Sequence, residues 1–156
     1  MSSLQSEFVT SHGQPIKRGL DTIIQMDEIS IRSGDITLAF LERNATAFCG
    51  VALKSTKGHI ELSDKKKVTL LYVWDLPELS GAIQYKVDCP DGILKVWNIY
   101  KIDNDRDLTK AEAWTNNSGI IVEVLGVNRR RYRCSDGIGE FEPEFIFEIS
   151  WSDQFS

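Results

Sequence analysis

The 156-residue sequence predicts an all-β fold: an antiparallel two-sheet β-sandwich of jelly-roll type, with at most one short helix. Apolar residues recur with a period of two from Ile36 to Trp151, as expected for strands that bury one face. Turn-forming Gly, Asn, Asp and Pro separate these runs at short intervals, and no βαβ alternation occurs. A closed barrel is the alternative, and the sandwich is favoured over it.

The first 19 residues are polar and aperiodic, and Gly13, Pro15 and Gly19 interrupt them. They predict a loosely attached N-terminal arm, with room for one strand around Phe8. Residues 20–156 show no internal repeat and no change of composition. They are therefore expected to form a single β-sandwich domain.

The first alternating runs lie at 36–40, 48–53 and 60–62. Turns are predicted before and between them, at Ser33-Gly34-Asp35 and at Lys57-Gly58. The next run, 68–74, is apolar on both faces. It predicts a central strand that is covered on both sides.

The later strands are predicted at 83–87, 94–102, 120–125, 130–134 and 145–151. Turn signals at Ser80-Gly81, Pro90-Asp91-Gly92 and Gly126-Val127-Asn128 lie between them. The stretch Asp107 to Trp114 is the one plausible helix, and it is about two turns long.

Composition limits the partners and the setting. With 23 acidic and 18 basic residues the net charge is −5, which argues against a nucleic-acid partner. No apolar run is long enough for a membrane span, and no secretory signal is visible. Cys49, Cys89 and Cys134 are too widely spaced for a zinc or redox motif, so buried thiols in a reducing compartment are expected. The expected location is cytoplasmic.

Catalytic motifs are scarce, and a non-catalytic protein is favoured over an enzyme. His12 and His59 are the two histidines, and neither a nucleophile elbow nor a phosphate-binding loop is present. A hydrolase with paired carboxylates stays open, because 23 acids offer many pairs and locate none of them.

No cofactor is expected, and calcium is the one that the sequence leaves open. Asp103-Asn104-Asp105 resembles the start of an EF-hand loop. However, Leu108 replaces the glycine and Trp114 the bidentate glutamate of such a loop. A solvated turn is favoured here, and a solvated edge is favoured for Glu140, Glu142 and Glu144.

The leading functional hypothesis is a non-catalytic carbohydrate-binding module. Trp97 lies on the more polar face of its strand, and Trp114 precedes a polar loop. An exposed tryptophan beside amide and carboxylate groups can stack on a sugar ring while its neighbours bind the hydroxyl groups. The predicted ligand-binding residues are Trp97, Asp105, Trp114, Asn116 and Asn117.

The alternative is a protein–protein module, such as an inhibitor or an assembly subunit. Arg129, Arg131 and Arg133 would share one face of a strand and could clamp carboxylates or phosphates of a partner. The competing interpretation is an edge strand protected by charge, paired with Glu123 or with residues 140–148. A barrel for a small ligand and a hydrolase rank lower, and the oligomeric state is left open.

Overall fold

The structure is a computed structural model that describes residues 11, 14–18, 21–43, 48–76, 81–101, 119–135 and 145–154. These residues form strands and no helix, as the alternating sequence predicts. The strands are β1 (Ile16–Arg18), β2 (Asp21–Ile23), β3 (Asp27–Ser30), β4 (Ser33–Arg43), β5 (Phe48–Lys54), β6 (His59–Glu61), β7 (Lys67–Val68), β8 (Leu70–Trp74), β9 (Ala82–Asp88), β10 (Ile93–Lys101), β11 (Gly119–Gly126), β12 (Arg129–Ser135) and β13 (Phe145–Asp153). The predicted helix from Asp107 to Trp114 lies outside the described residues.

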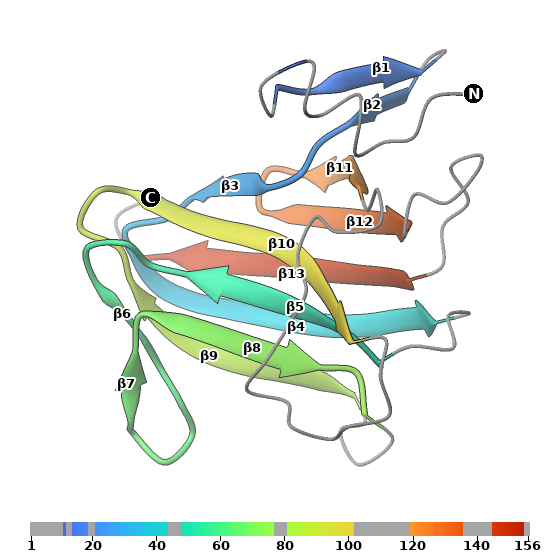
Figure 1. Cartoon of the computed structure of the whole chain (residues 1–156). Coiled ribbons are helices and arrows are strands. Elements are labelled where there is room, and N and C mark those ends of the chain that lie inside the picture. Colours follow the sequence, from blue (N-terminus) through green and yellow to red (C-terminus); the bar gives the residue numbers. More distant parts are fainter. Residues whose placement is uncertain are drawn as a thin grey trace.

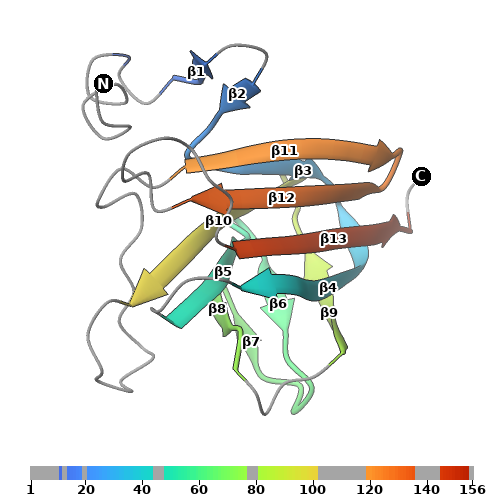
Figure 2. The same cartoon turned by 90° about the vertical axis from the view of Figure 1, so that its right-hand side faces the viewer.

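Two antiparallel sheets pack face to face as a β-sandwich (Figure 1). The smaller sheet has the strand order β3-β10-β5-β8, and the larger has the order β11-β12-β13-β4-β9-β6-β7. Figure 2 shows β11, β12, β13 and β4 side by side in the larger sheet. The predicted all-β sandwich is therefore confirmed, and its jelly-roll connectivity remains a prediction.

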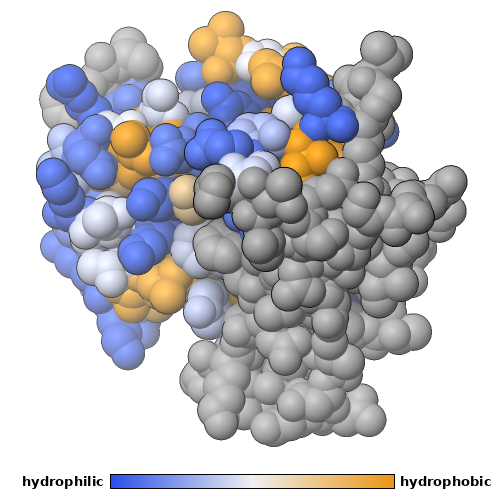
Figure 3. All heavy atoms as spheres, turned by 45° about the horizontal axis from the view of Figure 1, so that its top comes forward, coloured by the Kyte–Doolittle hydropathy of each residue, from blue (hydrophilic) through white to orange (hydrophobic). Residues whose placement is uncertain are grey.

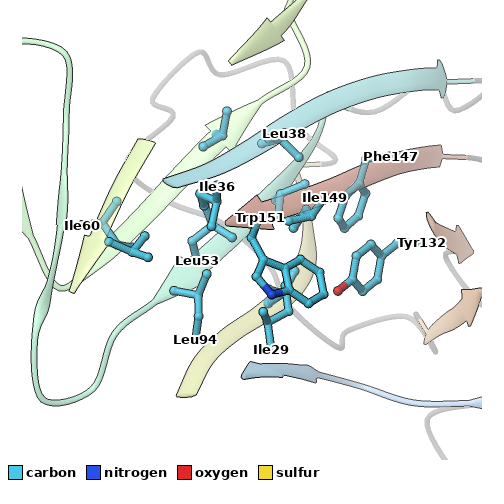
Figure 4. Close-up of a cluster of buried hydrophobic side chains, with 14 of the residues drawn as sticks. Ile29, Ile36, Leu38, Leu53, Ile60, Leu94, Tyr132, Phe147, Ile149 and Trp151 are labelled. Atoms are coloured by element: carbon cyan, nitrogen blue, oxygen red, sulfur yellow. The ribbon is translucent and has the colours of Figure 1, made fainter. Parts of the chain in front are cut away.

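The core lies between the two sheets, where alternate residues such as Ile36 and Leu38 of β4 or Phe147, Ile149 and Trp151 of β13 point inward (Figure 4). In β10, Leu94 and Val96 are fully buried, while Lys95 and Trp97 between them are partly exposed. On the larger sheet, Phe147 stacks on Tyr132, with ring centroids 4.7 Å apart. The period of two thus separates a buried face from an outward face along each strand.

A small hairpin extends the sandwich at one end. Strands β1 and β2 pair with each other, and Ile24 forms an isolated bridge to Ile120 of β11. Ile16 and Ile23 of the hairpin are buried and pack with Ile121. The described part of the predicted N-terminal arm thus contains β1, while the strand expected around Phe8 lies outside the described residues.

The prediction of one central strand over residues 68–74 is wrong. Thr69 separates β7, which pairs with β6 in the larger sheet, from β8, which is an edge strand of the smaller sheet. β8 is nevertheless apolar on both faces, since Leu71 and Val73 face the core while Tyr72 and Trp74 pack on the outside. The physical reason for apolar residues on both faces of β8 is therefore a second apolar layer on the outside of the sheet.

The turn predicted at Ser33-Gly34-Asp35 is also wrong, because these residues begin β4. Gly34 pairs with Asp153 of β13, and a Cβ atom at Gly34 would overlap the carbonyl oxygen of Ser152. The glycine allows two backbones to approach closely, which is a second reason for glycine in a strand.

Candidate functional site

The outward surface of the smaller sheet carries a second apolar cluster, which we call the aromatic face. Ala52, Trp74 and Ile99 are buried in it, and the partly buried residues packed against them are Tyr72, Leu76 and Trp97. Tyr72 and Trp74 meet edge to face, with ring centroids 6.5 Å apart and an interplanar angle of 76°. Aromatic rings from β8 and β10 thus gather on one side of the sheet.

Strand register brings these rings together. Trp97 is paired with Ala52 of β5, and Ala52 is paired with Tyr72 of β8. The three residues form one row across the sheet and project from the same face. The methyl group of Ala52 is the whole side chain between the two rings, and it is fully buried.

The next row of the aromatic face positions Trp74. Gly50 is paired with Trp74 on one side and with Ile99 on the other. A Cβ atom at Gly50 would lie 3.0 Å from Cε3 of Trp74, so the indole ring packs directly over the glycine. Trp74 is 5 % exposed and is a packing residue, whereas Tyr72 and Trp97 keep part of their surface accessible.

Two lysines border the aromatic face. Lys54 and Lys95 are directly paired across β5 and β10, two residues along from the Trp97–Tyr72 row. Neither lysine forms an ion pair within the part of the chain that the structure describes. Glu28 of β3 lies opposite Lys95 in the register and is exposed. The border therefore carries two cations and one anion.

Of the predicted sugar-binding residues, the structure describes Trp97 and places it on the aromatic face. Asp105, Trp114, Asn116 and Asn117 lie outside the described residues. Tyr72 is not among the residues predicted from the sequence, because the run 68–74 predicts a central strand with both faces covered. A signal was present in the sequence: Tyr72 and Trp74 alternate with Leu71 and Val73, so the aromatic pair belongs to one face.

The arginine row lies elsewhere, on the outward surface of the larger sheet. Arg129, Arg131 and Arg133 share that surface as predicted, but β12 lies between β11 and β13 and is not an edge strand. The predicted charge pairing is confirmed. Oε1 of Glu148 lies 2.9 Å from Nη2 of Arg129 and 3.6 Å from Nη2 of Arg131, and Glu123 Oε2 lies 3.4 Å from Nη2 of Arg133.

The edge strand next to β12 is β11, which ends in an apolar hairpin. Val124 and Val127 are 69 % and 95 % exposed. A register shift between Val124 and Gly126 interrupts the ladder with β12. Such a bulge limits the pairing of a further strand with an edge. On the face that Figure 3 draws, hydrophobic residues form separate groups among hydrophilic ones in the coloured part of the surface.

A shallow polar depression of about 310 Å³ contains the described histidine. Ser33, Asp88 and His59 form one row across β4, β9 and β6, and His59 Nδ1 lies 3.9 Å from Asp88 Oδ2. Nucleophilic catalysis of the serine type needs the imidazole between the serine and the carboxylate. Here the carboxylate lies in the middle, so this row does not supply that arrangement.

Metal ligands do not cluster in the described segments, where no group of three or more His, Cys, Asp or Glu side chains could hold an ion. The calcium candidates Asp103–Asp107 and Glu140–Glu144 lie outside those segments. The described ranges also hold no helix able to cross a membrane.

No family model, no curated protein and no solved structure matches this chain.

Proposed function

We propose that this protein is a non-catalytic binding module and that its aromatic face binds carbohydrate. The observation that carries the proposal is the row Trp97–Ala52–Tyr72, in which two partly exposed rings flank a residue with almost no side chain. The two rings arise from strands that are two spacings apart, or about 10 Å. That distance suits an oligosaccharide lying across the strands.

The chemistry of a sugar fits such a row. A pyranose ring presents apolar C–H groups on its faces and hydroxyl groups around its rim. Aromatic rings offer a large apolar area for the faces, and their preordered side chains lose little conformational entropy on binding. Lys54, Lys95 and Glu28 stand beside the row and supply donors and acceptors for hydroxyl groups.

The loop predicted to complete the site follows the same strand. β10 carries Trp97 and ends at Lys101, and the segment with Asp105, Trp114, Asn116 and Asn117 comes directly after it. Loops next to a rigid sheet are where binding residues concentrate. A contribution of these four residues to the sugar site remains part of the proposal.

The alternative, a protein–protein module built on the arginine row, has less support. Each of the three guanidinium groups already faces Glu123 or Glu148 of its own sheet. A partner would have to compete with these intramolecular pairs. At the aromatic face, neither Lys54 nor Lys95 forms an ion pair with another described residue.

The test is a titration of the protein against a broad panel of oligosaccharides, with Trp97→Ala and Tyr72→Ala as variants. Loss of one stacking contact should weaken binding at least about fivefold. Gln84→Ala, on the outward face of the larger sheet, is the control and should bind like the wild type. Chemical denaturation of each variant checks that the fold persists.

Two outcomes would overturn the proposal. The first is wild-type protein that binds no oligosaccharide of the panel. The second is folded Trp97→Ala and Tyr72→Ala protein that binds with wild-type affinity, because the sugar would then lie elsewhere.

A further inference from the structure

The paired lysines at the border of the aromatic face need an explanation. Lys54 and Lys95 are direct cross-strand neighbours, whose Cβ atoms are expected about 5 Å apart. Like charges in this position destabilise a sheet. They are retained here in a protein whose net charge is −5 and which offers many acids as partners.

Edge protection does not account for these lysines. Lysine on an edge strand prevents sheet-to-sheet association. β5 and β10 are the two central strands of the smaller sheet, whose edges are β3 and β8. The Lys65-Lys66-Lys67 run beside β7 is a case of the protective kind, since β7 closes one edge of the larger sheet.

The crowded arginines of the described structure are neutralised by acids. The three arginines of the arginine row share two glutamates, and Arg130 bonds to Asp27. Lys54 and Lys95 differ, since neither has an ion pair among the described residues. Glu28 is paired with Lys95 on the side away from Lys54, and both lysines are partly exposed.

The position of the lysines relative to the rings defines the ligand. Along β10, Lys95 and Trp97 are two residues apart, or about 7 Å. A sugar ring stacked on Trp97 would therefore bring a substituent on its rim, or on the next ring, within reach of both ammonium groups. An anionic substituent would lie between two cations that otherwise repel each other.

We infer that the aromatic face selects acidic saccharides, in which a carboxylate or sulfate group binds between Lys54 and Lys95. The inference rests on the proposed carbohydrate function and adds the chemical class of the ligand. Tyr72 and Trp97 provide affinity for the sugar ring. The lysine pair provides the preference for acidic over neutral sugars.

The experiment compares matched pairs of ligands by calorimetric titration. One pair is an oligouronide and its methyl-esterified counterpart, and the other is a sulfated oligosaccharide and its desulfated counterpart. The acidic member of at least one pair should bind more tightly, and the pair that responds identifies carboxylate or sulfate as the anion. Raising the ionic strength should reduce this preference, because salt screens exposed charges.

Lys54→Gln and Lys95→Gln should each weaken binding of the acidic member by up to about fivefold. They should weaken binding of the neutral member less, because glutamine keeps a hydrogen-bond donor for hydroxyl groups and loses the charge alone. Lys86→Gln, on the outward face of the larger sheet, is the matched control and should bind both members like the wild type. Polyglutamate, an anion without sugar rings, should bind weakly and without dependence on Trp97.

The experiment distinguishes failure of the inference about acidic saccharides from failure of the proposed carbohydrate function. If neutral and acidic members bind equally and Trp97→Ala abolishes both, the carbohydrate function stands and the inference is overturned. If polyglutamate binds as well as the acidic sugar, the lysines bind anions without the aromatic face, and the inference is again overturned. If no sugar of either kind binds, the carbohydrate function fails and the inference fails with it.

Discussion

Asp27 and Arg130 belong to opposite sheets of the sandwich, and Arg130 Nη1 lies 2.7 Å from Asp27 Oδ2. The hydroxyl group of Tyr132 donates to the same oxygen, also at 2.7 Å. The guanidinium group additionally donates to the carbonyl of Glu28 and lies 5.4 Å from the ring centroid of Trp151. One carboxylate on β3 thus ties the smaller sheet to β12 of the larger sheet.

Replacing this carboxylate should be costly. Asp27→Ala leaves the guanidinium of Arg130 and the hydroxyl of Tyr132 partly buried without their shared acceptor. We expect the free energy of unfolding to fall by about 3 kcal/mol, measured by urea denaturation. Glu123→Ala removes the acid from the more exposed pair with Arg133 and should cost less than about 1 kcal/mol. Equal costs for the two variants would show that the tie between the sheets adds no stability.

Alkaline pH should weaken the fold through Tyr132. Burial and the negative charge of Asp27 raise the pKa of Tyr132 far above its usual value of 10.0. The unfolded chain therefore loses this proton above about pH 10 while the folded protein keeps it. Stability attributable to Tyr132 is complete below that pH and falls progressively as the pH rises above it.

The measurement is urea denaturation between pH 8 and pH 11, on the wild type and on Tyr132→Phe. The variant should show a shallower alkaline loss, since it has no phenol to ionise at this position, although its stability at neutral pH is lower. Burial also raises the pKa of the Cys89 and Cys134 thiols, so part of the alkaline loss should remain in the variant. Identical pH profiles would contradict the prediction.

The cysteines should be inaccessible and unpaired. Cys49, Cys89 and Cys134 are free and buried, as the sequence analysis predicts. A thiol reagent should therefore react slowly with the folded protein and should find three thiols after denaturation without reductant. A count of one would mean that two of them had formed a disulfide.

Alanine should destabilise the protein strongly at Gly34 and have little effect on stability at Gly126. A Cβ atom at Gly34 would overlap the backbone of Ser152, whereas one at Gly126 would have no atom within 4 Å. Gly34→Ala should force β4 and β13 apart and cost about 3 kcal/mol. Gly126→Ala should change stability by less than about 1 kcal/mol. Both values come from denaturant midpoints, and a tolerant Gly34 would contradict the close approach.

Alternation in the sequence was sufficient to predict strands such as Ile36–Phe40 and Phe145–Trp151, because each buries one face. It could not predict which strands are neighbours. The same local pattern serves a central strand and an edge strand with a second apolar layer, so β8 was misplaced. Gly34 was assigned to a turn for a similar reason, since glycine serves turns and close backbone approaches alike.

The candidate site shows the same limit. Trp97 could be singled out because it interrupts a polar face between Lys95 and Lys101. Tyr72 could not be joined to it, because their proximity depends on the pairing of β5 with both β8 and β10. Likewise, the unbalanced charge of Lys54 and Lys95 becomes visible when the two strands are aligned. A local sequence pattern does not contain the register between strands that are distant in the sequence, and this register decides which side chains become neighbours.

β4, the central strand of the larger sheet, is paired with β13, although the two strands lie far apart in the sequence. During synthesis, residues 44–144 must be made after β4 before its neighbour β13 leaves the ribosome. Such distant pairing slows folding, because a large loop must close before the contact is formed. Until then one side of β4 is open to other chains, so the nascent protein is most exposed to aggregation before β13 is made.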